Sequence, residues 1–348
     1  MAGPLIKIID SKKSMFDYVP GCGAGIQKNE MNLNAKGGTE LMQQRMWDNL
    51  VEAGHEELLD KFQVIPSRVR ELDPDRIRLL WCHDLAEDGE VQFLKDEGYQ
   101  HFDKLVFVSH WQQQMYQTML GVPYSMGYVL QNAMHPSPDH VKPDPKDEIN
   151  LIYHTTPHRG LDILLPVFQS LYDDHWKGKV PIKLHVYSSF EIYGWKENDA
   201  PFKELFDQCI EHEAIEYHGV VDNEVMTQEV LPKMHIFAYP STWPETSCIS
   251  LMEAMSAGLC CVHSSFAALP ETSANWTMMY PYHEDKQKHA ETFAQNLFNS
   301  VRMIQDRSLD ARLGMQSVYA NSFYSWDVRT MQWSMFLQGL EGERGDAD

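Results

Sequence analysis

The chain has 348 residues, of which 43% are hydrophobic, so it is long enough to fill the cores of two domains of ordinary size. Its formal net charge of −21 argues against binding nucleic acid or an anionic membrane through its whole surface. We find no N-terminal signal sequence and no apolar run near the roughly 18 residues that span a bilayer. We therefore expect a soluble, cytoplasmic protein with no nucleic-acid partner and no stable membrane insertion.

The cysteines indicate a reducing compartment. None of the six belongs to a C-x-x-C pair, and Cys260 and Cys261 lie within an apolar run that is typical of a buried strand. We expect buried, reduced thiols, which fits the cytosol. The six are Cys22, Cys82, Cys209, Cys248, Cys260 and Cys261.

The chain begins with the pattern of a strand, a glycine-rich segment and a helix. Residues 4–10 suit the first strand of a parallel sheet, and residues 21–25 contain three glycines. Gly37 and Gly38 then precede a helix, although a glycine pair by itself more often marks a simple turn. The helix has apolar residues at spacings of three and four, which predicts one buried face. These residues are Leu41, Met42, Met46, Leu50 and Val51.

Two further strands are predicted before a linker. Residues 76–84 end in His83 and Asp84, which places this polar pair at the carboxyl end of a strand, where open α/β sheets bind ligands. An incidental His83 and a helix-capping Asp84 remain the alternative. Residues 104–108 form the next strand. Residues 137–148 are rich in proline and charge without apolar periodicity, which predicts a domain boundary there.

The second domain is predicted to open with a strand, a polar turn and a helix. The strand covers residues 150–154, the turn contains Arg159 and Gly160, and an i, i+3, i+4, i+7 apolar stripe follows. Residues 183–190 form a further strand and loop. Residues 234–241 are short, apolar and rich in aromatic and β-branched residues, as in a buried strand.

Two glutamates near this last strand have an informative spacing. Glu245 and Glu253 are eight residues apart, which in one helix would separate them by about 80° around the axis. We therefore place Glu245 in a loop and Glu253 in the helix that follows. Thr246 or Ser247 would cap that helix, and Gly258 would end it.

A loop carboxylate beside a helix start suits a ligand with two kinds of group. The free N–H groups and the helix dipole favour an anion such as a diphosphate, whereas the carboxylate can bind sugar hydroxyls. A nucleotide-sugar carries both groups. For an isolated pair of glutamates at this spacing, a surface helix with an acidic first turn is the more common explanation.

The wider neighbourhood resembles a known family. The sequence YPSTWPETSCISLMEAMSAGLCCVHSS, residues 239–265, is similar to the donor motif of retaining GT-B glycosyltransferases of the glycosyltransferase family 4 type, also called glycosyl transferases group 1. The resemblance implies an α/β fold of two Rossmann-like domains that face each other across a cleft, with a C-terminal helix that crosses back to the N-terminal domain. We expect an acceptor domain at 1–140, a donor domain at 141–322, the crossover helix at 323–340 and a disordered tail at 341–348. Within the crossover helix, the apolar spacing predicts that Val328, Met331, Met335 and Phe336 share one face.

The resemblance also implies the roles of the site residues. Glu245 would bind the sugar hydroxyls, Glu253 the ribose and Arg159 the diphosphate. The predicted catalytic residues are Glu245, His83 and Arg159, and the predicted donor-binding residues are Gly37, Gly38, Arg159, Gly160, Gly219, Val220, Thr246, Ser247, Cys248 and Glu253.

The chain departs from the family at the diphosphate. Members often have an Arg in the turn and a Lys before the glycine, but here Arg159 takes the second place and Thr155 or Thr156 the first. Its planar guanidinium suits phosphate oxygens. Lys183, Lys196 or backbone N–H groups would supply the missing positive charge.

The function that the resemblance implies is retaining transfer of a hexose from a UDP- or GDP-sugar to a hydroxyl acceptor, such as a glycan or glycoconjugate. No metal or other cofactor is expected, since the leaving phosphate itself would take the acceptor proton. None of the remaining histidines shows a metal-ligand spacing. The sugar, the base, the linkage and the oligomeric state remain open.

Other functions are weaker alternatives. Asp73, Pro74 and Asp75 form a D-x-D that a metal-dependent GT-A transferase would use, but no strand precedes them. A nucleotide-sugar epimerase or a binding protein without transferase activity would keep the same fold. A dehydrogenase is disfavoured because no G-x-G-x-x-G follows the first strand.

Overall fold

A computed structural model describes residues 38–67, 69 and 72–345. The predicted strand at residues 4–10, the glycine-rich residues 21–25 and Gly37 lie outside this range. The described chain divides into two compact units, each treated separately below. The large unit consists of residues 135–321, and the small unit of residues 38–134 together with 322–345. Among the described helices, none is long and apolar enough to cross a membrane.

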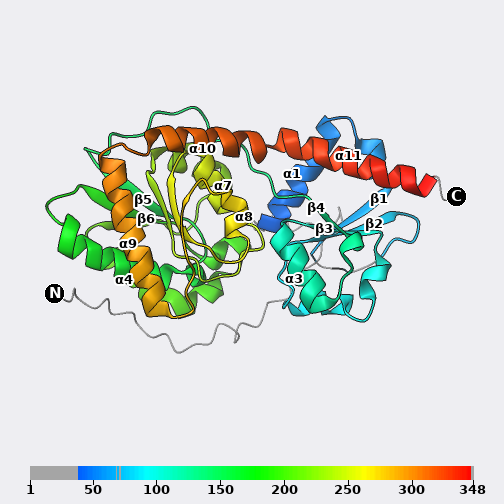
Figure 1. Ribbon diagram of the computed structural model, residues 1–348, viewed down its shortest axis with the longest axis horizontal. Coiled ribbons are helices and arrows are strands. Elements are labelled where there is room, and N and C mark those ends of the chain that lie inside the picture. Colours follow the sequence, from blue (N-terminus) through cyan, green and yellow to red (C-terminus); the bar gives the residue numbers. More distant parts are fainter. Residues whose placement is uncertain (1–37, 68, 70–71, 346–348) are drawn as a thin grey trace. The chain divides into compact units, whose positions relative to one another are not determined.

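The small unit is built on a four-stranded parallel sheet in the order β1-β2-β3-β4 (Figure 1). Two of these four strands were predicted from the sequence: β2, which ends one residue before His83, and β3, which begins at Lys104. The buried residues Met42, Met46 and Leu50 confirm the predicted apolar face of the first helix. The elements are α1 (Gly38–Glu52), α2 (Glu56–Leu59), β1 (Phe62–Pro66), β2 (Ile77–Cys82), β3 (Lys104–Phe107), α3 (His110–Leu120), β4 (Gly127–Val129) and α11 (Trp326–Gly345).

The last helix, α11, packs against the sheet and α1 of the small unit. Trp333 lies edge-on to Trp81 of β2 with the ring centroids 5.0 Å apart, and Phe336 stacks on Tyr128 of β4 at 4.3 Å. These contacts confirm the predicted return of the C-terminal helix to the N-terminal sheet. Large aromatic rings from both ends of the sequence thereby form one core.

The predicted apolar face of this helix is partly wrong. Met331 and Met335 are 56% and 65% exposed, and the buried face is instead formed by Trp326, Arg329, Trp333, Leu337 and Leu340. Arg329 reaches 2% exposure because its Nη2 donates to Phe323 O at 2.9 Å. The helix also continues to Gly345, so residues 341–345 are helical where a disordered tail was expected.

The large unit contains a six-stranded, wholly parallel sheet in the order β10-β9-β8-β5-β6-β7. The chain adds β6 and β7 on one side of β5, then returns to add β8, β9 and β10 on the other. The elements are β5 (Ile149–Tyr153), α4 (Leu161–Leu171), β6 (Ile182–Val186), α5 (Lys203–Glu211), β7 (Ile215–Tyr217), α6 (Asn223–Val225), β8 (Ile236–Tyr239), α7 (Ile249–Ser256), β9 (Cys260–Ser264), α8 (Leu269–Ser273), β10 (Met278–Tyr280), α9 (Lys286–Gln305) and α10 (Asp310–Phe323).

This strand order fixes a switch point between β5 and β8. All residues of these two strands and of β9 are buried, as expected for a parallel sheet that is covered on both faces. The helix α9 packs against α4 and the central strands, and α7 packs against β9 (Figure 1). The two loops that leave β5 and β8 therefore start beside each other, where doubly wound sheets bind their ligands.

The segment between the units belongs to the large one. Lys142 donates through Nζ to Met234 O at 2.7 Å, and His235 bonds through Nε2 to Pro143 O at 3.0 Å. The division falls after Met134, six residues before the predicted boundary, because residues 135–140 also pack on the large unit. The described cysteines are all buried and free, as expected: Cys82, Cys209, Cys248, Cys260 and Cys261.

Buried histidines predict that the large unit loses stability in mild acid. His263 on β9 is fully buried, donates through Nδ1 to Ser264 O at 2.8 Å and accepts through Nε2 from Thr277 Oγ1 at 2.7 Å. Burial lowers its pKa from 6.5 to about 4. Between these values the unfolded chain binds a proton that the folded chain does not, so the free energy of unfolding falls as the pH falls.

At pH 5.5 this histidine alone should cost about 1.4 kcal/mol relative to pH 8. Urea unfolding of wild type, His263→Gln and the exposed control His101→Gln at both pH values measures the effect. We expect His263→Gln to lose less stability on acidification than the other two proteins. An equal loss in all three would contradict the assignment.

Candidate functional site

The loop that follows β5 carries several polar groups into the buried edge of the sheet. It starts at His154, bends at Thr155 and forms a single 3-10 turn over Pro157–Arg159, with Thr156 as the N-cap residue. Tyr153 Oη donates to Thr156 O at 2.8 Å and so fixes the start of the turn. Arg159 therefore leaves the sheet at a defined place beside β8.

Gly160 lets this turn lie directly against the loop that follows β8. Its φ of +118° lies in the region that favours glycine, and a methyl group here would stand 2.3 Å from Pro240 O. A side chain would thus collide with the neighbouring backbone as well as strain its own. The predicted glycine is required for close packing of the two loops.

The loop after β8 brings Glu245 to Arg159. Glu245 is only 5% exposed, and its Oε1 accepts from Arg159 Nη1 at 2.5 Å and from the hydroxyl of Tyr239. A buried carboxylate needs such partners, since an unpaired charge would be very costly. Both donors use the same oxygen, and no residue in the described part of the chain is seen to donate to Oε2.

The electrostatics favour a charged Arg159. Burial by itself would lower the pKa of Arg159, but the charge of Glu245, the hydrogen bond to it, and Tyr193 and Tyr239 together outweigh burial and raise that pKa above its usual value. Burial and the same carboxylate raise the pKa of Tyr239, which therefore stays protonated and donates. The guanidinium also lies over the Trp243 ring, 5.9 Å from its centroid.

The helix α7 begins two residues later than its predicted caps suggest. Cys248 is the N-cap residue and makes no side-chain capping bond, so the prediction that Thr246 or Ser247 caps the helix is wrong. Its first N–H groups are consequently not satisfied by a capping side chain. Gly258 has φ of +67° just beyond the helix, as predicted for its end.

Glu253 lies within α7 and is 4% exposed. Its Oε1 accepts from Asn223 Nδ2 at 2.8 Å, and Asn223 begins the short helix α6 after β7. Gly219, with φ of +69°, and Val220 form the turn between β7 and α6. The second glutamate is thus held toward a turn that was predicted to bind the donor.

Buried polar atoms without a protein partner gather along the carboxyl edge of this sheet. Within the described residues, Arg159 Nε has no acceptor, although the same guanidinium is bound through Nη1. Such atoms are rare in proteins and mark places where a ligand or water completes the hydrogen bonding. The others are His154 Nε2, Thr156 Oγ1 and His158 Nδ1 after β5, Ser188 Oγ after β6, and Ser247 Oγ before α7.

The histidines of this edge are neutral. Burial lowers the pKa of His154 to about 3, and burial together with the charge of Arg159 lowers the pKa of His158. His158 stacks on Phe190 with the ring centroids 5.1 Å apart and meets Trp243 edge-on at 4.6 Å. Arg159 is therefore the cation that these two loops bring to the edge.

The other predicted cations are used elsewhere. Lys183 is the second residue of β6, at the amino end of the strand, and pairs with Glu216. Lys196 is exposed and pairs with Glu191 at 2.9 Å. The prediction that Lys183 could share an anion with Arg159 is wrong, since it lies at the opposite end of the sheet.

The predicted residues of the small unit lie at the corresponding place in its own sheet. His83 directly follows β2, and its ring lies 4.6 Å from Trp81. Burial lowers its pKa to about 3, so the imidazole is neutral. Asp84 O accepts from Gln112 Nε2 at 2.8 Å and Tyr116 Oη at 3.1 Å, which anchors the loop to α3. Gly38 is the first residue of α1.

The D-x-D sequence lies in a turn between β1 and β2, so the prediction that no strand precedes it is wrong. Asp73 Oδ1 accepts from Asp75 N at 3.0 Å, and Asp73 pairs with Arg76 at 3.3 Å.

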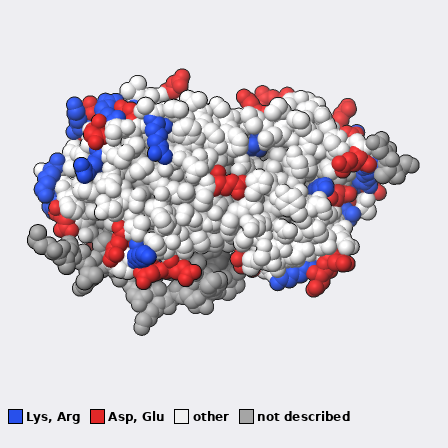
Figure 2. Space-filling model, viewed as in Figure 1, with Lys and Arg blue, Asp and Glu red and all other residues white. Residues whose placement is uncertain are grey.

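On the face shown in Figure 2, acidic and basic side chains lie next to one another and form no extended basic patch.

Tyr239 and Asn223 are site residues that the sequence analysis did not single out. Tyr239 is the last residue of a buried strand and stands six positions before Glu245, so its place at a strand end was a usable signal. Asn223 had no such signal, because its partner lies 30 residues away.

A known protein family matches the part of the chain that contains the candidate site. Residues 152–298 match the family model described as Glycosyl transferases group 1. This range runs from β5 into α9 and includes the Arg159 turn, the Glu245 loop and α7. No curated protein sequence matches the chain.

Solved glycosyltransferase structures share the fold. Sucrose-phosphate synthase from Thermosynechococcus elongatus has a TM-score of 0.61 at 13% identity over 95% of this chain and 82% of its own. HepE from Anabaena, solved with UDP-glucose, has 0.56 at 13% over 76% and 72%. A variant of TarM from S. aureus, solved with UDP, alpha-GlcNAc-glycerol and Fondaparinux, has 0.54 at 14% over 76% and 51%.

The chain spans about half the length of that TarM chain. At these identities the likeness concerns the fold alone. Together with the two parallel sheets, it confirms the predicted α/β fold with two Rossmann-like domains of the GT-B class.

The contact between the two loops makes Gly160 a test of the site's construction. We expect Gly160→Ala to lower the free energy of unfolding by about 3 kcal/mol, from backbone strain and overpacking together. Gly194→Ala is the matched control, since Gly194 has φ of +76° but no atom within 4 Å of an added methyl group. It should lose only about 1 kcal/mol. Equal losses in urea unfolding would show that the loops are not in contact.

Proposed function

We propose that this protein is a glycosyltransferase that moves a hexose from a nucleotide-diphospho-sugar to a hydroxyl group of a glycan or glycoconjugate, with retention of the anomeric configuration. The observation that carries the proposal is the buried Glu245–Arg159 pair at the switch point, surrounded by unsatisfied polar atoms. Such an edge offers both a cation for a diphosphate and acceptors for hydroxyls.

The sugar would lie against Glu245. Its free Oε2 accepts hydrogen bonds from sugar hydroxyls, while Arg159 and Tyr239 hold Oε1 and fix the orientation of the carboxylate. The neighbouring Trp243 offers an apolar surface to the sugar ring, which favours a hexose.

The nucleotide would lie along α7. The uncapped N–H groups at its start, near Thr246, Ser247 and Cys248, attract the diphosphate together with Arg159. Glu253, oriented by Asn223, accepts hydrogen bonds from the ribose hydroxyls. Gly219 and Val220 supply backbone groups for the base.

The chemistry is chiefly electrostatic. The bond between the anomeric carbon and the leaving phosphate oxygen breaks, and negative charge grows on the diphosphate, which Arg159 and the α7 N–H groups stabilise. The acceptor hydroxyl attacks from the same face, and its proton passes to the leaving phosphate. Neither a protein nucleophile nor a metal ion takes part. For the small unit by itself, we assign to the neutral imidazole of His83 a hydrogen bond to a hydroxyl group at the carboxyl edge of that unit's own sheet.

Structural neighbours support the choice of donor. HepE was solved with UDP-glucose and a TarM variant with UDP, so this fold accommodates a uridine nucleotide in related structures. A panel of UDP- and GDP-hexoses with hydroxyl acceptors, followed by NMR of the product's anomeric proton, tests the proposal. A retained configuration is expected. An inverted product, or isomerised nucleotide-sugar without an acceptor, would contradict it.

The two glutamates should affect different kinetic constants. Glu245→Ala removes a contact to the reacting sugar and should lower kcat by about 100- to 1000-fold. Glu253→Ala removes hydrogen bonds to the ribose, and should raise the donor KM about 10- to 100-fold while kcat changes little. Glu229→Ala, at an exposed position, is the control and should retain both constants. Turnover of Glu245→Ala at the wild-type rate would refute the assigned role.

A further inference from the structure

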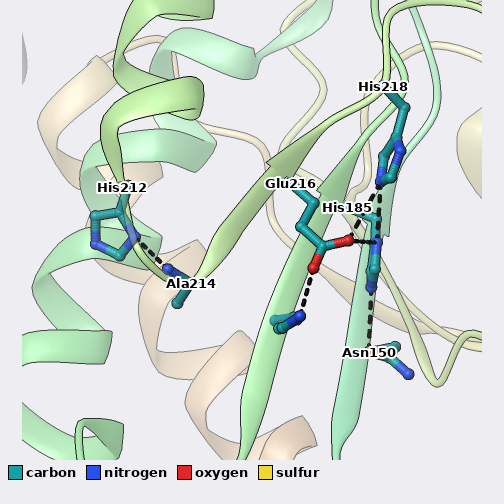
Figure 3. Close-up of polar contacts among 7 residues, drawn as sticks. Asn150, His185, His212, Ala214, Glu216 and His218 are labelled. Atoms are coloured by element: carbon teal, nitrogen blue, oxygen red, sulfur yellow. Dashed lines mark hydrogen bonds and ion pairs between the residues drawn. The ribbon is translucent and has the colours of Figure 1, made fainter.

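Three potential metal ligands come together on the β6–β7 side of the large unit's sheet. His185 lies on β6, Glu216 on the adjacent β7, and His218 directly after β7 (Figure 3). Their ligand atoms all lie within 4.8 Å of one another. Because β6 and β7 pair in parallel with His185 opposite Glu216, His185 lies beside residues that are 31 and 33 positions away in sequence.

The distances between the three atoms suit one small cation. His185 Nδ1 lies 3.1 Å from His218 Nε2 and 3.5 Å from Glu216 Oε2, and His218 Nε2 lies 3.8 Å from the same oxygen. Ligand atoms around a tetrahedral zinc ion with bonds of 2.0–2.1 Å stand about 3.3 Å apart. Only small side-chain movements separate the observed triangle from that geometry.

Neighbouring side chains orient the ligands. His185 Nε2 donates to Asn150 Oδ1 at 3.1 Å, which leaves Nδ1 as the unprotonated nitrogen that faces the other two ligands. Lys183 holds Glu216 Oε1 and turns Oε2 toward the histidines. Such outer contacts to a histidine and a carboxylate are typical of metal sites.

The triad is also accessible to solvent. The side chain of His185 is 12% exposed and those of His218 and Glu216 are 31% and 41% exposed. An ion can therefore enter from solvent and keep a water molecule as a further ligand.

We propose that His185, Glu216 and His218 form a binding site for a divalent transition-metal ion of the zinc type. The ion binds His185 Nδ1, His218 Nε2 and Glu216 Oε2. His218 carries its proton on Nε2 in the metal-free state, where it donates to His185, and shifts to the Nδ1–H tautomer when the metal binds. Two imidazoles and one carboxylate select zinc over magnesium, which prefers oxygen ligands.

The site would stabilise structure rather than take part in the transfer reaction. Its ligands lie on β6, on β7 and directly after β7, whereas Arg159 and Glu245 follow β5 and β8. A bound ion links the edge strand β7 to its neighbour and fixes His218, whose ring also stacks on Tyr187 at 4.4 Å. The proposal does not depend on the proposed function.

Calorimetric titration of ZnCl₂ into the tag-free, EDTA-treated and dialysed full chain tests the site. We expect one ion per chain, a higher melting temperature with zinc, and no effect of MgCl₂. His218→Gln and Glu216→Gln should each weaken zinc binding at least 10-fold. His212→Gln is the matched control, because His212 lies in the same unit and bonds to Ala214 N instead of the triad (Figure 3).

Circular dichroism and the melting temperature in EDTA verify that each variant folds. His218→Gln is suited to this purpose because the side chain is partly exposed and its loss leaves no buried cavity. Zinc binding by wild type that is absent, or that is equal in His218→Gln, Glu216→Gln and His212→Gln, would overturn the proposal.

Discussion

The ion pair between Arg159 and Glu245 is the interaction on which the candidate site depends. At the switch point Glu245 is buried and the side chain of Arg159 is 20% exposed, and Glu245 without Arg159 would be an unpaired buried charge that costs several kcal/mol. The pair forms because β5 and β8 are neighbours, although the two residues are 86 positions apart. Gly160 keeps the two loops in contact, and Tyr239 adds the second donor to Glu245. Close packing of the two loop backbones thus holds the charged groups of Arg159 and Glu245 in a fixed position.

Holding Glu245 through one oxygen has a functional consequence. Arg159 and Tyr239 orient the carboxylate through Oε1, and Arg159 Nε has no partner among the described residues. A site that was fully satisfied by its own side chains would have little to gain from a ligand. The partly satisfied groups along this edge are therefore a stronger indication of binding than the presence of charged residues alone.

The sequence analysis predicted the features of this site that depend on residues close together in sequence. The eight-residue spacing correctly placed Glu245 in a loop and Glu253 in a helix, and parallel strands were also predicted correctly. The sequence analysis failed where packing between residues far apart in the sequence determines which side chains are buried. The buried face of α11 was misassigned because Met331 and Met335 have the same helical spacing as a buried stripe, whereas Trp81 of β2 selects Trp333.

The same limit applies to polar partners. Tyr239 with Glu245, Asn223 with Glu253, and the triad around His185 all follow from loop paths and from the register of parallel strands. Sequence spacing contains no record of these neighbours, so the histidines showed no metal-ligand pattern.

The most direct test of the account is calorimetric binding of nucleoside diphosphates to the full chain. UDP, GDP and ADP would be titrated into wild type and into Glu253→Gln, which keeps the size of the buried side chain but removes its charge. We predict that one diphosphate, UDP by analogy with the structural neighbours, binds wild type at one site and binds the variant at least 10-fold more weakly. Absence of binding by all three, or equal affinity in both proteins, would contradict a nucleotide site at this edge of the sheet.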